Sequence, residues 1–109
     1  MRPIQDNDVF HAISHPARRA ILVALKGGER AAGELAAPFD MSFAAVSQHL
    51  GILEEARLVT ARRDGRRRLY HLHPRPLRDV MSWIDEFSAY FDQRLDALGD
   101  YLDNKHGKP

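Results

Sequence analysis

Five arginines crowd into seven residues in the middle of this chain. They are Arg62, Arg63, Arg66, Arg67 and Arg68. Guanidinium groups pair with phosphates and insert into narrow minor grooves, so a cluster of this density indicates contact with nucleic acid. The alternative is a solvated charged turn, which is common for one or two charges but not for five. We therefore expect this segment to lie along a nucleic-acid backbone.

A second group of polar side chains lies on the helix predicted just before the arginines. Val46, Leu50 and Leu53 repeat at helical spacing and predict its buried side. The opposite side is small or polar, with side chains able to reach base edges in a major groove, while Ser42 is a good N-cap where a phosphate would be favoured. The alternative is an ordinary helical hairpin with a solvated face. The candidate DNA-contacting residues here are Ser42, Phe43, Ala44, Ser47, Gln48 and His49.

Local signals place the elements that must position these residues. Asp6 or Asn7 can cap a first helix, and Pro16 suits the start of a second. A short third helix begins near residue 31, so residues 31–56 form a helix-turn-helix. Asp64-Gly65 predicts the turn of a β-hairpin over 58–72. We predict a single domain over 1–109, mainly α with a small β-hairpin wing: a winged helix-turn-helix.

The last predicted helix, residues 76–103, is too long for one small domain to cover. At 1.5 Å per residue it would span about 40 Å. Its apolar stripe, with one face of the first helix, most simply packs on a second copy of the chain. The expected dimer residues are Val9, Phe10, Ile13, Met81, Ile84, Phe87, Phe91, Leu95, Leu98 and Leu102.

Composition further limits the classes of protein to which the chain can belong. The chain has 109 residues, 44% of them apolar and 28% charged, with no cysteine, which excludes disulfides and thiolate metal sites. The net charge of +1 hides a segregation: residues 56–78 carry +7, and the segments before and after carry −2 and −4. The N-terminus lacks the apolar run of a secretory signal and no stretch could span a membrane, so we expect a cytoplasmic location.

Other chemistry is poorly supported by the residues. His11 and His15 have a zinc-compatible spacing, but Pro16 ends the helix beside them, and His71 and His73 are a weaker pair. No phosphate loop, nucleophile–base pair or zinc-protease motif is present, so we expect neither an enzyme nor a cofactor.

The chain resembles the ArsR/SmtB family of bacterial winged-helix repressors. The resemblance lies in residues 12–22 (AISHPARRAIL), in 33–36 (GELA), in Met41-Ser42 with 46–50 (VSQHL) and 53–59 (LEEARLV), and in the arginine segment up to Tyr70. It covers about residues 8–102. It implies a homodimer that binds an inverted-repeat DNA operator and represses transcription, often of its own operon.

The resemblance also implies where a metal would bind, and those ligands are missing. The positions of the family's Cys-x-Cys pair are Ala31 and Gly33 here, and the last helix has no histidine for the second site. The chain instead resembles the metal-independent subgroup, whose last helix carries a tryptophan and several aromatics, as Trp83 and Phe87 do here. The alternatives left open are a sensor with a histidine metal site, a small-ligand pocket at the dimer seam, and a winged helix used only for protein contact.

Overall fold

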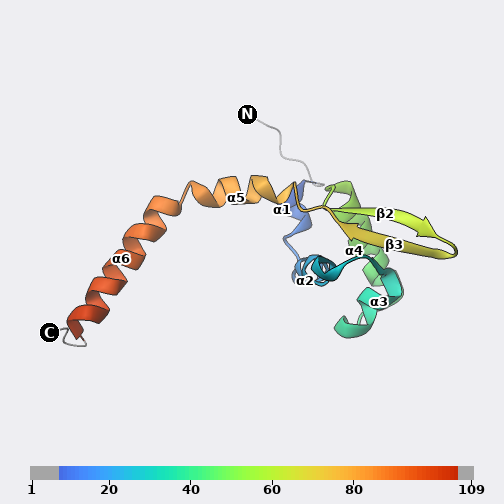
Figure 1. Ribbon diagram of the computed structural model, residues 1–109, viewed down its shortest axis with the longest axis horizontal. Coiled ribbons are helices and arrows are strands. Elements are labelled where there is room, and N and C mark those ends of the chain that lie inside the picture. The colour runs from blue at the N-terminus through green and yellow to red at the C-terminus, as the bar shows by residue number, and fades with distance from the viewer. Residues whose placement is uncertain (1–7, 106–109) are drawn as a thin grey trace.

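The computed structural model describes residues 8–105 (Figure 1). Asp8 is the N-cap of its first helix. Its carboxylate accepts a hydrogen bond from the His11 backbone N–H at 2.9 Å, at the N-terminus of α1 (Val9–Ala12). The cap expected at Asp6 or Asn7 was therefore wrong, and those two residues lie outside the described range. The cap satisfies a backbone donor that the first helical turn leaves free.

The second helix starts where proline predicted it. α2 spans Pro16–Ala24, and a 3₁₀ turn, η1, follows over Leu25–Gly27. Pro16 lacks an N–H that the first turn could not pair, and the His15 ring accepts the N–H of Ala17 at 3.0 Å. Gly28 then leaves the helix at φ 127°, a conformation that side chains disfavour.

The predicted helix-turn-helix is present. α3 spans Ala32–Ala36, a 3₁₀ turn η2 spans Ala37–Phe39, and α4 spans Phe43–Glu55. Asp40 adopts a left-handed conformation in the turn between them. The predicted stripe Val46, Leu50 and Leu53 is fully buried and anchors α4 in the core, so the opposite side of the helix must face outward.

A small antiparallel sheet carries the arginines. β2 (Val59–Asp64) pairs with β3 (Arg67–Leu72), and a short strand β1 (Arg30–Ala31) adds to the other edge of β3. Asp64 lies opposite Arg67, so the turn is Gly65-Arg66 and not the predicted Asp64-Gly65. Gly65 has a φ of 65°, which suits glycine at the first position of a tight hairpin turn.

The single long helix predicted over 76–103 was wrong, because two helices occupy that region. α5 spans Leu77–Asp85 and α6 spans Ser88–Lys105. Ser88 Oγ donates to the Asp85 carbonyl at 2.8 Å, and the Phe87 N–H bonds three residues back to Ile84. A serine that competes for a helical carbonyl favours a break of this kind.

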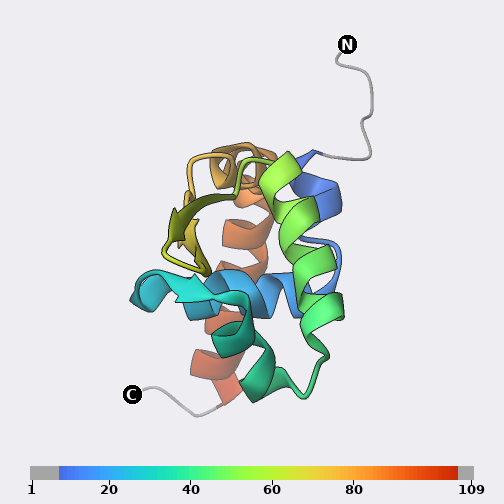
Figure 2. The same cartoon turned by 90° about the vertical axis from the view of Figure 1, so that its right-hand side faces the viewer.

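The two last helices extend from the body as an arm (Figure 1). The radius of gyration is 19.3 Å, whereas a compact chain of this length has about 13 Å. Leu77 and Val80 pack against the core, and Phe10 meets the Trp83 ring edge-on at 6.1 Å. Figure 2 shows the body end-on, with the hairpin and α3 on one side of α4. No helix in residues 8–105 is long and apolar enough to cross a membrane.

Candidate nucleic-acid interface

The outward side of α4 borders a hollow between the helix and the wing. Phe43, Ser47, Gly51 and Glu54 line it from α4, and the start of α3 and the arginines of β3 and its turn line the rest. The hollow has a volume of about 590 Å³ and is open to solvent. Helix and hairpin therefore form two walls of one concave surface.

Most candidate residues of α4 are accessible from outside. Phe43 is 64% exposed, so its ring is not packed into the core at the start of the helix. Ala44 and Gln48 are also exposed, and Ser47 is half-buried at the hollow. The Ser42 oxygen accepts the Ala45 N–H at 3.1 Å as the N-cap, which leaves its O–H free to donate. A Cβ at Gly51 would meet nothing within 4 Å, so packing does not require glycine there.

His49 lies apart from these residues, against α2. Its Nδ1 accepts from Nη1 of Arg18 at 3.2 Å, and its ring packs on that of His15 with centroids 4.7 Å apart. Arg18 is 6% exposed and also donates to the Ala12 carbonyl at 2.6 Å. Burial, with the charges of His15 and Arg18, lowers the pKa of His49. These contacts place the His49 side chain in the packing between α4 and the start of α2.

The lowered pKa predicts a pH-dependent stability. His49 loses protons more readily in the folded chain than in the unfolded one, so its contribution is complete above the unfolded pKa of about 6.5. The contribution is lost as the pH falls through the lower folded pKa. We expect chemical denaturation to show that His49→Asn costs most at pH 7.5 and least at pH 5. His73→Asn, at an exposed position, is the control, and equal trends for both variants would contradict the assignment.

The histidines of this cluster are poorly arranged for a metal. Nδ1 of His15 accepts from the Ala17 backbone and Nδ1 of His49 accepts from Arg18. Each neutral ring therefore keeps its proton on Nε2, and a metal could bind only after these hydrogen bonds or tautomers changed. In the part of the chain that the structure describes, no three His, Asp or Glu side chains gather as a metal site.

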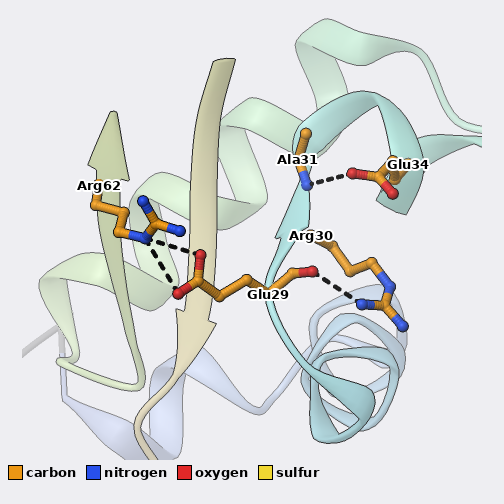
Figure 3. Close-up of polar contacts among 5 residues, drawn as sticks. All are labelled: Glu29, Arg30, Ala31, Glu34 and Arg62. Carbon is orange, nitrogen blue, oxygen red and sulfur yellow. Dashed lines mark hydrogen bonds and ion pairs between the residues drawn. The ribbon is translucent and has the colours of Figure 1, made fainter. Parts of the chain in front are cut away.

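Three of the five wing arginines form ion pairs that sequence reasoning missed. Arg62 Nε lies 2.9 Å from Glu29, and Arg67 bonds to Glu34. Arg68 Nη2 lies 3.0 Å from Glu54, near the end of α4. Figure 3 shows the Glu29 side chain reaching across β3 to Arg62. The hydrogen bonds to Glu29 and Glu54 raise the pKa values of Arg62 and Arg68.

The other two wing arginines face solvent. Arg63 and Arg66 are exposed and form no ion pair within residues 8–105. Glu34 has a second role, since it accepts the Ala31 N–H at 3.0 Å at the start of α3. That hydrogen bond is the main reason why the pKa of Glu34 is lowered. The wing therefore presents both free and paired guanidinium groups.

The expected dimer residues divide between the body and the arm. Val9 is buried in the core of the single chain, so it is unavailable to a partner, and Ile13 packs against that core. Phe10 is 40% exposed beside Trp83. The arm residues are all exposed apolar side chains, namely Met81, Ile84, Phe87, Phe91, Leu95, Leu98 and Leu102.

Comparison with known proteins identifies the group to which this fold belongs. A family model described as bacterial regulatory protein, arsR family, matches residues 15–61. The chain is 42% identical over 89 residues to the transcriptional repressor SdpR of Bacillus subtilis (strain 168), covering 82% of this chain and 99% of that protein. The chain belongs to the ArsR family.

Further similarities support the ArsR assignment. The chain is 40% identical over 95 residues to the HTH-type transcriptional regulator Rv2034 of Mycobacterium tuberculosis (strain ATCC 25618 / H37Rv), covering 84% of this chain and 89% of that protein. A crystal structure described as a possible transcriptional regulator for arsenical resistance superposes with a TM-score of 0.71 at 39% identity, covering 86% and 96% of the two chains. These confirm the resemblance and the winged helix-turn-helix. This ArsR-family chain is a DNA-binding transcriptional repressor and not an enzyme.

Proposed function

We propose that this ArsR-family repressor binds an inverted-repeat operator as a homodimer, reading bases with α4 and holding phosphates with the wing. The observation that carries the proposal is the concave surface where the exposed side of α4 meets the arginine hairpin. An α-helix fits a major groove, and an adjacent basic hairpin can follow the flanking backbone. In a bacterial cell such a repressor works in the cytoplasm, beside the chromosome.

The residues of α4 take different roles in this proposal. Ser47 and Gln48 donate and accept hydrogen bonds at base edges, and Phe43 and Ala44 offer apolar contacts such as a thymine methyl group. Ser42 lies at the helix N-terminus, where the free O–H and backbone N–H groups favour a phosphate. His49 supports α4 from behind through its contacts with α2.

The arm is the surface through which a second copy of the chain binds. Met81, Phe91 and Leu95 are each at least half exposed, and so large an apolar surface is unusual on a monomer. Pairing two arms buries this surface and sets two α4 helices about 34 Å apart, one turn of the DNA helix. Phe10 joins the interface beside the base of the arm.

We further propose that the repressor works without the family's cysteine metal site. The positions expected to carry the cysteine pair are Ala31 and Gly33, neither of which can ligate a metal through its side chain. His15 and His49 already use their Nδ1 atoms within the fold. DNA affinity should therefore be the same with and without zinc.

Fluorescence anisotropy tests this function. The protein is titrated against labelled DNA from upstream of its own gene and against random duplex, at two salt concentrations, with and without excess zinc. Tight, salt-sensitive binding to the upstream DNA that ignores zinc supports the proposal. Equal affinity for the two duplexes would show that this DNA holds no operator, and a zinc-dependent affinity would contradict metal independence.

Sequence discrimination should depend on α4 more than on the wing. In the double variant Ser47→Ala with Gln48→Ala, we expect the preference for operator over random duplex to fall by roughly 30-fold or more, as each of the two lost base contacts costs about 1–3 kcal/mol. Random-duplex affinity and its salt dependence should hardly change, since phosphate contacts remain. Anisotropy titrations against both duplexes measure this, and an unchanged preference would remove these residues from the reading face.

A further inference from the structure

The acidic partners of the wing arginines occupy a surface where acids are unfavourable for DNA binding. Glu54 lines the hollow itself, and its carboxylate bonds Arg68 at 3.0 Å. Glu29 and Glu34 pair with Arg62 and Arg67 in the same way. The three acids come from three places, the loop before β1, α3 and the end of α4, so local sequence spacing does not account for the pattern.

These pairs are not needed to shape the wing. The backbone ladder between β2 and β3 already fixes the hairpin, with Arg62 opposite Leu69 and Arg63 opposite Arg68. The paired arginine side chains remain 57–61% exposed, and ion pairs between such exposed groups hold their partners only weakly. The pairs are therefore easily opened by a stronger anion.

The charge of the surface changes when the pairs open. A phosphate that binds Arg68 must displace the Glu54 carboxylate, or share the guanidinium with it, and the displaced acid then lies close to the DNA backbone. Both effects work against binding of any polyanion. Arg63 and Arg66 carry no such competitor among the described residues and can meet a phosphate directly.

We propose that Glu29, Glu34 and Glu54 are built-in competitors of DNA phosphates for the wing arginines, and that they set the affinity of this surface for DNA. The inference rests on the proposed role of the wing in DNA binding. It adds three acidic residues to the DNA-binding surface. The role of these acids is to oppose DNA binding, since they reduce the affinity for DNA of any sequence. Only Arg63 and Arg66 bind phosphate without first giving up a carboxylate partner.

The test begins with Glu54→Gln, which keeps the shape of the side chain and removes its charge. From the strength of exposed ion pairs, we expect random-duplex affinity at low salt to rise about 1.5- to 5-fold. If the three pairs act independently, the affinity of the triple variant Glu29→Gln, Glu34→Gln, Glu54→Gln should rise by roughly 3- to 100-fold. Asp92→Asn is the control, since it changes the net charge equally on α6, at the far end of the molecule from the hairpin (Figure 1).

A double-variant cycle separates competition from mere proximity of charge. If Glu54 acts mainly by occupying Arg68, then Glu54→Gln should raise the affinity clearly less in the Arg68→Ala background than in the wild type. A gain of the same size in both backgrounds would overturn the competitor role. A loss of affinity in Glu54→Gln would also overturn it, because that result would make Glu54 a positioning residue for Arg68.

Retention on immobilised heparin, a polyanion, measures the same competition for the wing arginines and needs no operator DNA. Glu54→Gln should elute at higher salt than the wild type and Asp92→Asn. If the proposed function fails, the wild-type protein will show no preference for operator over random DNA. The difference in heparin elution between Glu54→Gln and Asp92→Asn would still be seen. Equal elution of Glu54→Gln and Asp92→Asn would reject the inference alone. Thermal unfolding of each variant confirms that the compared proteins are folded.

Discussion

We expect the replacement of Arg66, Arg67 and Arg68 with alanine to lower the affinity for operator and random DNA alike, by roughly 100-fold. Hydrogen bonds to charged groups contribute about 1.5–3 kcal/mol each, and release of Glu34 and Glu54 offsets part of that, which leaves about 1 kcal/mol per arginine. Each lost phosphate contact also makes the plot of log affinity against log salt concentration less steep by about 0.9. The steepness of this plot, the salt slope, should therefore fall by as much as about 2.7. Anisotropy titrations across a salt series measure both quantities.

A charge-matched control makes this result specific to the wing. Arg75, Arg78 and Arg94 are exposed residues outside the hairpin, and replacing these three with alanine removes the same net charge. We expect the salt slope of DNA binding by this triple variant to stay near that of the wild type. An equal fall in the two triple variants would show that overall charge, and not the hairpin, drives binding.

The second large effect concerns the arm. In the double variant Phe91→Glu with Leu95→Glu, we expect the protein to sediment with the mass of one chain instead of two. Both side chains are exposed in the single chain, so the variant should still fold. Like charges on a buried apolar seam oppose pairing because each would lose its hydration. Operator affinity should fall at least 100-fold, since two linked half-site contacts gain about 10²- to 10⁴-fold over one.

The opposite face of α6 provides the control for this experiment. Gln93→Glu with Ala97→Glu adds two acids on the same helix, at positions turned away from the apolar stripe. This control should remain dimeric and bind the operator. Sedimentation of the Phe91 and Leu95 variant as a dimer would place the interface elsewhere on the chain.

Local signals were enough to predict the helix-turn-helix and the position of the wing. The stripe of Val46, Leu50 and Leu53, with Ser42 as N-cap, depends on contacts within a few residues and on helical spacing. The hairpin was found from the glycine in its turn, but the turn itself was placed one residue too early. Glycine marks the region of a positive φ without fixing which of its neighbours still belongs to the strand.

Features that depend on distant contacts were missed. β1 has only two residues, and it exists because it pairs with β3, nearly 40 positions later in the chain. The ion pairs of Glu29 and Glu34 follow from this pairing and carry no local signal. Glu54 was within reach of sequence reasoning, because it lies seven residues after Ser47 and so on nearly the same side of α4.

The break in the arm and the packing of His49 both depend on contacts that helical spacing does not encode. Apolar spacing continues through residues 85–88, so periodicity alone predicts one helix, whereas the bond from Ser88 to the Asp85 carbonyl accompanies a break. His49 lies on a helix with an exposed face, but its ring meets Arg18 from the preceding part of the fold. Sequence spacing locates a residue on a helix, and the neighbouring helix decides whether that side is accessible.

Selection from a pool of randomised DNA duplexes tests the central claim most directly. The purified protein is incubated with the pool, bound duplexes are recovered and amplified over several rounds, and the enriched sequences are read. We expect one inverted repeat to emerge, with half-site centres about 10 base pairs apart, bound by two chains per duplex. A final pool as random as the first would contradict operator recognition, and enrichment of a single half-site bound by one chain would contradict the homodimer.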